Sequence, residues 1–207
     1  MNTAWMDSII EGLRIYGEYG MVATFVIMGI KTMVSKKVNF VEIAAWQMFV
    51  MYLCCVVELV FFPLPTMEQA AALSIQYQII PFHFIADLME DSVVRVMCQV
   101  LFNIVMTIPL GMFLQYGVGF NLKETALAGF GFTAFIEVGQ LTGLYFLFKG
   151  SYRLFDVDDL MLNVLGTLIG YVVMRVAEEH FIPEMSAFDR TMGTQGAAEQ
   201  ECKIITR

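Results

Sequence analysis

The sequence predicts an all-α, polytopic membrane protein: a helix bundle of about five transmembrane helices, with an interfacial or re-entrant segment between the second and the third. Of its 207 residues, 58% are hydrophobic and only 15% are charged, against roughly 45–50% apolar and about 25% charged in soluble domains. The apolar residues also gather in runs long enough for helices of roughly 20 residues, the length that crosses a bilayer. Five such helices leave no room for a separate soluble catalytic domain.

The elements follow in order along the chain. Residues 1–15 are predicted to be an N-terminal approach segment, and the first span runs from Tyr16 to Met33. The second span, Val41–Phe62, stops before two prolines, which cannot continue a helix. The three remaining spans are expected over Val93–Tyr116, Glu124–Phe148 and Leu160–Val176. The transmembrane domain therefore covers residues 16–176, and residues 177–207 are expected to form a polar, loose tail.

The segment between the second and third spans is apolar enough to resemble a further span. Within it, residues 70–86 include the polar or helix-breaking residues Ser74, Gln76, Gln78, Pro81 and His83. A helix of this composition would leave amide groups unsatisfied in hydrocarbon. We therefore predict that the segment lies at the membrane interface or re-enters the membrane.

Charge and cysteine content exclude several classes of function. The net charge of −8 argues against a nucleic-acid partner, because nucleic-acid binding depends on basic residues. The cysteines Cys54, Cys55, Cys98 and Cys202 lack paired metal-ligand spacing and companion histidines. Neither a structural zinc site nor a disulfide framework is therefore expected. No basic region precedes the first apolar run, so we expect the first span to be retained rather than cleaved as a signal peptide.

Basic residues near the span ends indicate the orientation, because cytoplasmic loops carry an excess of lysine and arginine. With the N-terminus outside, the cytoplasmic side receives Lys31, Lys36, Lys37, Lys123 and Arg175. The outer side receives Arg14, Arg95, Lys149 and Arg153. This bias predicts an N-terminus outside and a C-terminus inside.

Polar residues recur at helical spacing on three predicted spans. Steps of three or four residues place each set on one helix face. The sets are Gln99, Asn103, Thr107 and Gly111; Thr133, Glu137 and Gln140; and Arg153, Asp156, Asp159, Asn163, Gly166 and Gly170. An ionisable residue such as Glu137 inside an apolar run is costly, and it indicates a site or a buried partner.

The predicted topology places these polar groups, together with Glu58, in the outer half of the membrane. We therefore expect a polar cavity that opens outward and is lined by Asn103, Glu137, Gln140, Arg153, Asp156, Asp159 and Asn163. Arg153 is expected to neutralise the surrounding carboxylates. Helix packing is assigned to Pro109, Gly111, Gly166 and Gly170. A purely structural interpretation stays open, with acids capping the fifth helix and amides joining helices.

Four motifs resemble the VanZ-like family, which is named for a teicoplanin-resistance protein. They are IIPF at Ile79–Phe82, NIVMTIPLG at Asn103–Gly111, IEVGQ at Ile136–Gln140 and RLFDVDDLMLNVLG at Arg153–Gly166. The resemblance covers roughly residues 20–175, and the last two motifs are its most specific part. It implies a small multi-spanning protein of the bacterial cytoplasmic membrane, and a link in some members to lipoglycopeptide tolerance. It implies no settled mechanism.

Three functions are compatible with these residues. The first is a non-catalytic protein that binds or rearranges a membrane lipid or a lipid-linked cell-wall species at the outer leaflet, without a cofactor. The second is a metal-dependent enzyme acting on a lipid head group, with Mg²⁺ or Ca²⁺ held by Glu137, Asp156 and Asp159. It lacks an obvious base, because neither His83 nor His180 lies in a polar stripe. The third is a solute or proton transporter using Glu137, although no inverted repeat is detectable.

Overall fold

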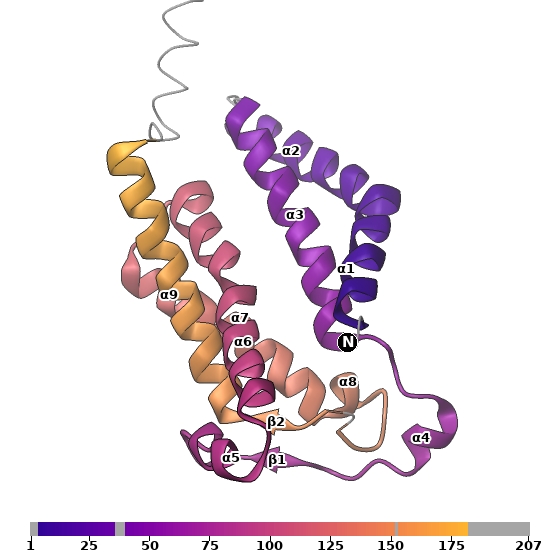
Figure 1. Cartoon of the computed structure of the whole chain (residues 1–207). Helices are drawn as coiled ribbons and strands as arrows, with labels where there is room; N and C mark the ends of the chain where they lie inside the picture. The colour runs from indigo at the N-terminus through magenta and orange to yellow at the C-terminus, as the bar shows by residue number, and fades with distance from the viewer. Residues whose placement is uncertain (1–3, 36–39, 152, 182–207) are drawn as a thin grey trace, which may run out of the picture.

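The computed structural model describes residues 4–35, 40–151 and 153–181 (Figure 1). These residues are mostly helical, which confirms the predicted all-α class. The elements in order are α1 (Ala4–Ile15), the π-helix η1 (Tyr16–Gly20), α2 (Met21–Ser35), α3 (Phe40–Phe61), α4 (Met67–Ala71), β1 (Tyr77–Gln78), α5 (Phe84–Glu90), α6 (Val93–Phe113), the π-helix η2 (Leu114–Val118), α7 (Leu122–Leu141), α8 (Gly143–Phe146), β2 (Phe155–Asp156) and α9 (Val157–His180).

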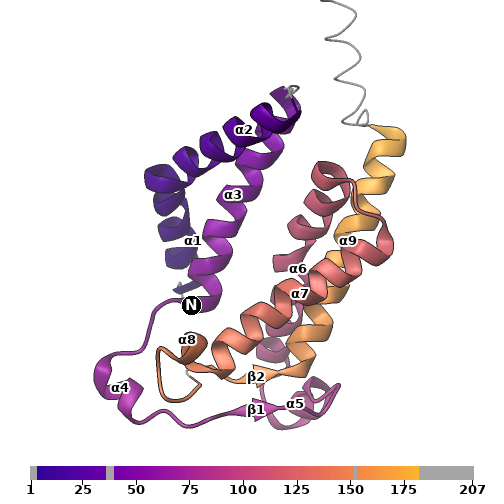
Figure 2. The ribbon, with the colours of Figure 1, turned by 180° about the vertical axis from the view of Figure 1, so that it is seen from behind.

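The long helices form two groups (Figures 1 and 2). In the first group α1 and α2 accompany α3, and in the second α6 and α9 pack closely with α7 beside them. The groups are joined by a hydrogen bond of 3.0 Å from the Tyr52 hydroxyl in α3 to the Met106 carbonyl in α6. Near the C-terminal end of α3 they also share a hydrophobic cluster formed by Val56, Val60, Phe61 and Ile136.

Four helical stretches are long and apolar enough to cross a membrane: Trp5–Met33, Phe40–Phe61, Val93–Val118 and Val157–His180. The chain is therefore a multi-pass membrane protein. The predicted count of five spans is not confirmed, because α7 is not among these stretches. α7 has 20 residues, but polar side chains such as Glu124, Glu137 and Gln140 make it less apolar. It nevertheless returns the chain from the end where α6 stops to the end where α9 begins (Figure 2).

The first span begins earlier than its predicted start at Tyr16. Helix α1 begins at Ala4 and continues through η1 into α2. The wide turn of a π-helix is a common cause of a bend, and the chain bends between α1 and α2 (Figure 1). Gly12 lets α1 approach α3, because a Cβ atom at Gly12 would lie 2.6 Å from the Cα of Cys55. Residues 4–15 are therefore part of the bundle.

The predicted fourth span, Glu124–Phe148, is too long at its C-terminal end. Helix α7 ends at Leu141, and the next residues have left-handed backbone angles, with φ of +63° at Gly143 and +56° at Leu144 and Tyr145. A right-handed helix cannot continue through these angles. The fifth span is longer than predicted and ends at His180. The predicted tail lies outside the described residues from position 182 onward.

No long helix forms between α3 and α6, which agrees with the interfacial segment predicted there. The segment contains α4, β1 and α5 and passes across one end of the bundle (Figure 1). Strand β1 pairs in parallel with β2, with Gln78 opposite Asp156. The Ser151 hydroxyl accepts a bond of 2.6 Å from the Gln76 amide nitrogen. These contacts fix the segment to the chain that leads into α9.

Glycines allow the backbones of α6 and α9 to touch. A Cβ atom at Gly111 would lie 1.8 Å from the carbonyl oxygen of Thr167. Cβ atoms at Gly166 and Gly170 would each lie 2.1 Å from carbonyl oxygens of α6, those of Ile104 and Ile108 respectively. Pro109, which the sequence grouped with these glycines, instead lines a cavity between α6 and α3. The glycines thus lie at the α6–α9 contact, and Pro109 lines the neighbouring cavity.

Substitution of Gly166 by alanine should force α6 and α9 apart. We expect a loss of about 1–3 kcal/mol in the free energy of unfolding, the usual cost of overpacking, measured by thermal unfolding of the purified chain in detergent. Gly131 in α7 is the matched control, because a Cβ atom there would meet nothing within 4 Å. Gly131→Ala should keep or raise the melting temperature. Equal melting temperatures for the two variants would contradict the close α6–α9 contact.

Candidate functional site

The junction of β2 and α9 brings together a carboxylate at the end of β2 and one from α7. Asp156 caps α9, because its side chain accepts a bond of 2.8 Å from the amide of Asp158. The amide of Asp156 in turn donates to Oε2 of Glu137 at 3.2 Å. Both side chains are buried. An aspartate is favoured at a helix N-terminus, where unpaired amides and the helix dipole attract negative charge, so the sequence itself begins α9 at this place.

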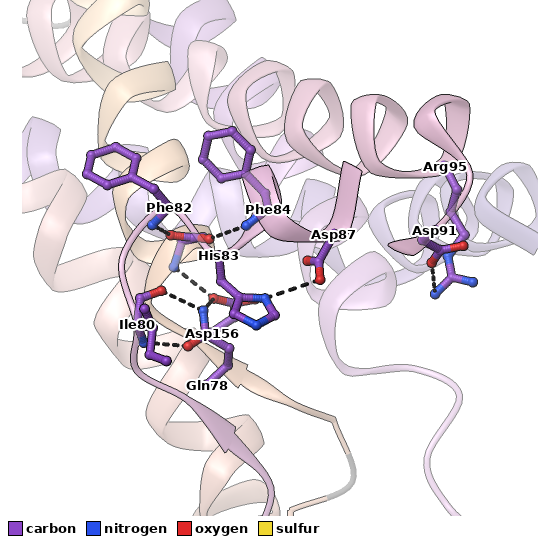
Figure 3. Close-up of polar contacts among 10 residues, drawn as sticks. Gln78, Ile80, Phe82, His83, Phe84, Asp87, Asp91, Arg95 and Asp156 are labelled. Carbon is purple, nitrogen blue, oxygen red and sulfur yellow. Dashed lines mark hydrogen bonds and ion pairs between the residues drawn. The ribbon is translucent and has the colours of Figure 1, made fainter. Parts of the chain in front are cut away.

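Burial is the main influence on the Asp156 carboxyl, and it raises the pKa of this group. The hydrogen bond from the Asp158 amide lowers the pKa, the negative charge of Asp158 raises it, and the nearby imidazole of His83 lowers it. Figure 3 shows His83 beside Asp156, although the two residues come from distant parts of the chain. The loop before α5 therefore belongs to this site.

Asp158 holds that loop against α9. Its carboxylate accepts bonds from the amide nitrogens of Phe82 at 2.6 Å and of Phe84 at 3.0 Å (Figure 3). Phe82 has a φ of +64°, a left-handed angle that a bulky residue adopts only under constraint. The imidazole Nδ1 of His83 lies 3.2 Å from Oδ1 of Asp87. Asp158 thereby places a histidine–carboxylate pair next to Asp156.

Asp159 lies one step further along α9 and faces α6. It accepts a hydrogen bond from the side-chain amide of Asn103, and the side chain of Gln99 lies near it. Gln99 is exposed and Asp159 is half-buried, so this group reaches the surface of the bundle. The predicted polar stripes of the third and fifth spans thus meet here.

Asn163 lies one turn deeper and bonds only to other buried groups. Its amide nitrogen donates to the Thr133 hydroxyl at 3.0 Å, and its backbone carbonyl accepts from Thr107 at 2.7 Å and from Thr167 at 2.9 Å. Asn163 is 2% exposed, and the three threonines are buried as well. Such bonds join α6, α7 and α9 in the way that polar residues join membrane helices.

Gln140 and Arg153 bond to backbone carbonyls at the C-terminal end of α3. The Gln140 side chain donates to the Val60 carbonyl at 3.0 Å, and the Arg153 guanidinium donates to the Phe62 carbonyl at 3.0 Å. The predicted ion pair between Arg153 and the carboxylates is therefore wrong. The last carbonyls of a helix lack helical partners and attract cations, and α3 presents such carbonyls to Arg153.

The seven predicted site residues therefore divide into three sets. Asn103, Glu137, Asp156 and Asp159 gather near the start of α9, Asn163 lies within the bundle, and Gln140 and Arg153 bind the end of α3. Sequence reasoning missed Asp158 and His83. Asp158 is outside the helical stripe, and the place of His83 depends on the fold of a loop. Within the described ranges, no group of three or more His, Cys, Asp and Glu side chains is arranged to hold a metal ion.

The arrangement can recognise polar groups without covalent chemistry. Asp159 offers carboxylate oxygens at the surface, and Gln99, His83 and Arg153 offer nitrogen donors at the same end of the bundle. A guanidinium has five N–H donors, and the side chain of Arg153 is exposed. Acceptors and donors of this kind suit a phosphate, an amine or a sugar hydroxyl.

Replacement of Asp158 by alanine should release the loop that carries His83. Two partly buried backbone amides would lose a charged acceptor, at a cost of about 2 kcal/mol, so the amide hydrogens of Phe82 and Phe84 should exchange roughly 30-fold faster. Hydrogen exchange followed by mass spectrometry measures this. Asp91→Ala is the control, because Asp91 forms a surface ion pair with Arg95 and accepts a hydrogen bond from the adjacent Ser92 amide. Unchanged exchange rates in Asp158→Ala would show that the hydrogen bonds from Phe82 and Phe84 to Asp158 do not hold the loop in place.

Comparison with known proteins identifies the family of this chain. A family model described as VanZ/LLP1 matches residues 49–178, which is well over half of the chain. The matched region runs from the middle of α3 to the end of α9, so it contains the junction of β2 and α9 and the α6–α9 contact. No curated protein and no solved structure matches the chain. The family match confirms the resemblance found in the motifs: the chain belongs to the VanZ/LLP1 family.

Proposed function

We propose that this protein binds the polar head of a membrane lipid or lipid-linked cell-wall species at the end of the bundle where α9 begins. The observation that supports this most directly is Asp159. It is a half-buried carboxylate on a membrane-spanning helix, it accepts a hydrogen bond from Asn103 of another helix, and the exposed side chain of Gln99 lies near it. Ionisable residues are costly within membrane helices and generally have a functional role there.

The deeper residues support the site without contacting a ligand. Glu137 is 2% exposed, and its carboxylate accepts the Asp156 amide. It therefore fixes the start of α9 relative to α7. Asp156 likewise caps α9, and Asp158 likewise holds the loop before α5 against α9. We assign ligand contact to Gln99, Asp159, His83 and Arg153, and positioning to the buried acids.

Exposed apolar side chains lie on the segment that crosses this end of the bundle. The loop before α6 exposes Ile79, Ile80, Phe82, Ile85 and Met89, each at least half exposed. Apolar side chains on a loop beside membrane helices suit the boundary between head groups and acyl chains. A lipid head bound at Asp159 would thus meet polar groups while its chains stay in the bilayer.

We propose further that this end faces outward and that lipid binding there lowers the access of a lipid-anchored antibiotic such as teicoplanin. The lysine and arginine distribution supports the orientation. The family supports the link to antibiotic tolerance.

Asp159→Asn should lower the amount of lipid that remains bound after gentle purification by about tenfold, equivalent to about 1.4 kcal/mol. The substitution keeps the shape of the side chain and removes its charge. Glu137→Gln should have a smaller effect, because Glu137 acts through the position of Asp156. Bound lipid is measured by mass spectrometry, together with folded yield, melting temperature and antibiotic susceptibility.

Glu58→Gln is the matched control for this experiment. Glu58 is also a buried carboxylate near the same end of the bundle, but it lies in α3. This variant should keep its lipid. Full lipid content and full function in folded Asp159→Asn and Glu137→Gln would refute the site, and equal losses in all three variants would assign the effect to buried charge in general.

The orientation and the crossing of α7 can be tested together by labelling cysteines with a membrane-impermeant reagent. Lys123 lies in the first turn of α7 and Lys149 lies beyond its C-terminal end, and both side chains are exposed. In a background without Cys54, Cys55, Cys98 and Cys202, Lys149→Cys should be labelled in intact cells and Lys123→Cys only after permeabilisation. The reverse pattern would invert the orientation. Labelling of both in intact cells would mean that α7 does not cross.

A further inference from the structure

Two hollows lie at the other end of the helices, away from Asp159. The first is an apolar cavity of 460 Å³ between the first half of α3 and the last part of α6. The second is a polar pocket of 350 Å³ between η2, the start of α7 and the end of α9. Tyr116 lines both, and the adjacent residues Met174 and Arg175 of α9 line one each. An apolar compartment and a polar compartment therefore adjoin.

The apolar cavity has the length of one bilayer leaflet. Its α3 wall runs from Val41 to Tyr52, or about 16 Å at roughly 1.5 Å per residue, close to half of a hydrocarbon core of about 30 Å. Beyond the Tyr52–Met106 hydrogen bond the helices close on the Val56 cluster, so the cavity ends near the middle of the bundle. Phe49 and Phe113 stack in its wall, with ring centroids 3.8 Å apart. The cavity suits one acyl chain that points to the bilayer centre.

The polar pocket holds one cation and one anion. Arg175 and Glu178 line it, together with Gln115, Asn121 and Tyr171. Gln115 is 8% exposed and donates to Glu178, while its carbonyl oxygen is buried without a hydrogen-bond partner in the described part of the chain. Buried acceptors are nearly always paired, so this oxygen indicates a donor that the described residues do not supply. The pocket therefore suits a group that brings both a negative charge and an N–H donor.

We propose that these two compartments form a single binding site for a zwitterionic glycerophospholipid. One acyl chain occupies the apolar cavity, the phosphate lies near Arg175, and the ammonium group lies near Glu178 and the Gln115 carbonyl. Net charge distinguishes this ligand from an anionic phospholipid, which would bring no cation to Glu178. The site is separate from the proposed function, whose residues lie at the opposite end of the helices, and each can fail without the other.

Trp46 provides a reporter for the cavity. Its ring lies 4.9 Å from the ring of Phe113 in the cavity wall, and the only other tryptophan is Trp5. In the Trp5→Phe background, the full chain is reconstituted in phosphatidylglycerol vesicles with rising fractions of brominated phosphatidylethanolamine or brominated phosphatidylglycerol. Bromine on the acyl chain quenches tryptophan on contact. We expect half-maximal quenching at an about threefold lower fraction of the phosphatidylethanolamine, the scale of a partly exposed ion pair.

Two variants separate the compartments. Ala44→Phe should fill the apolar cavity and reduce quenching by both lipids, because Ala44 lines it. Arg175→Gln should remove the preference between the lipids. The control is Arg95→Gln, because Arg95 and Arg175 are both exposed and both form ion pairs with acids four residues away, at opposite ends of the bundle.

The outcomes decide the proposal even where a variant is unstable. Equal quenching by the two lipids in the Trp5→Phe protein would overturn it, and so would a preference that persists in Arg175→Gln. If the preference for phosphatidylethanolamine were lost in both Arg175→Gln and Arg95→Gln, the preference would come from the overall charge of the protein. That result would also overturn the proposal. If Ala44→Phe does not fold, the two arginine variants still decide, since both replace exposed side chains.

Discussion

The rest of the structure depends on the contact between the backbones of α6 and α9. Within a bilayer, apolar side chains gain little by leaving lipid, so helices associate through close packing and hydrogen bonds. Gly111, Gly166 and Gly170 provide the close packing. Once the two backbones touch, the Thr107 hydroxyl reaches the Asn163 carbonyl, and Asn103 reaches Asp159. The polar stripes therefore meet because glycines lie beside them on the same helix faces.

Three aspartates within four residues perform three different tasks. Asp156 caps α9, Asp158 binds the amides of a distant loop, and Asp159 faces α6 and the surface. Backbone geometry explains the division, because Asp156 is an N-cap residue with extended backbone angles, whereas Asp158 and Asp159 are consecutive helical residues that point about 100° apart around α9. Only the third task leaves a carboxylate at the surface. This is why we assign ligand contact to Asp159 and positioning to its neighbours.

The sequence predicted the features that follow from periodicity and failed on those set by tertiary contacts. Long apolar runs located the α3 span and the span that begins with α6 to within about two residues, which is the usual disagreement on helix ends. The spacing of three or four residues between polar side chains correctly placed Asp159 and Asn163 on one face of α9. The sequence did not predict the left-handed turn after Leu141, because Leu144 and Tyr145 have no intrinsic preference for positive φ. It also paired Arg153 with carboxylates, since the competing carbonyls of α3 lie 91 residues away in the chain.

The position of α3 explains how one small bundle can present different surfaces at its two ends. Near its C-terminal end, α3 is fixed to the second helix group by the Val56 cluster, by Gln140 and by Arg153. Nearer its N-terminal end, α3 and α6 line an apolar cavity and touch each other through the stacked rings of Phe49 and Phe113. The Tyr52–Met106 bond marks the boundary between the two regions. The closed end can hold polar groups in fixed positions, because the Val56 cluster and the bonds of Gln140 and Arg153 join its helices. The open end can admit an apolar chain without breaking any of those contacts, so binding at one end need not disturb the geometry of the other.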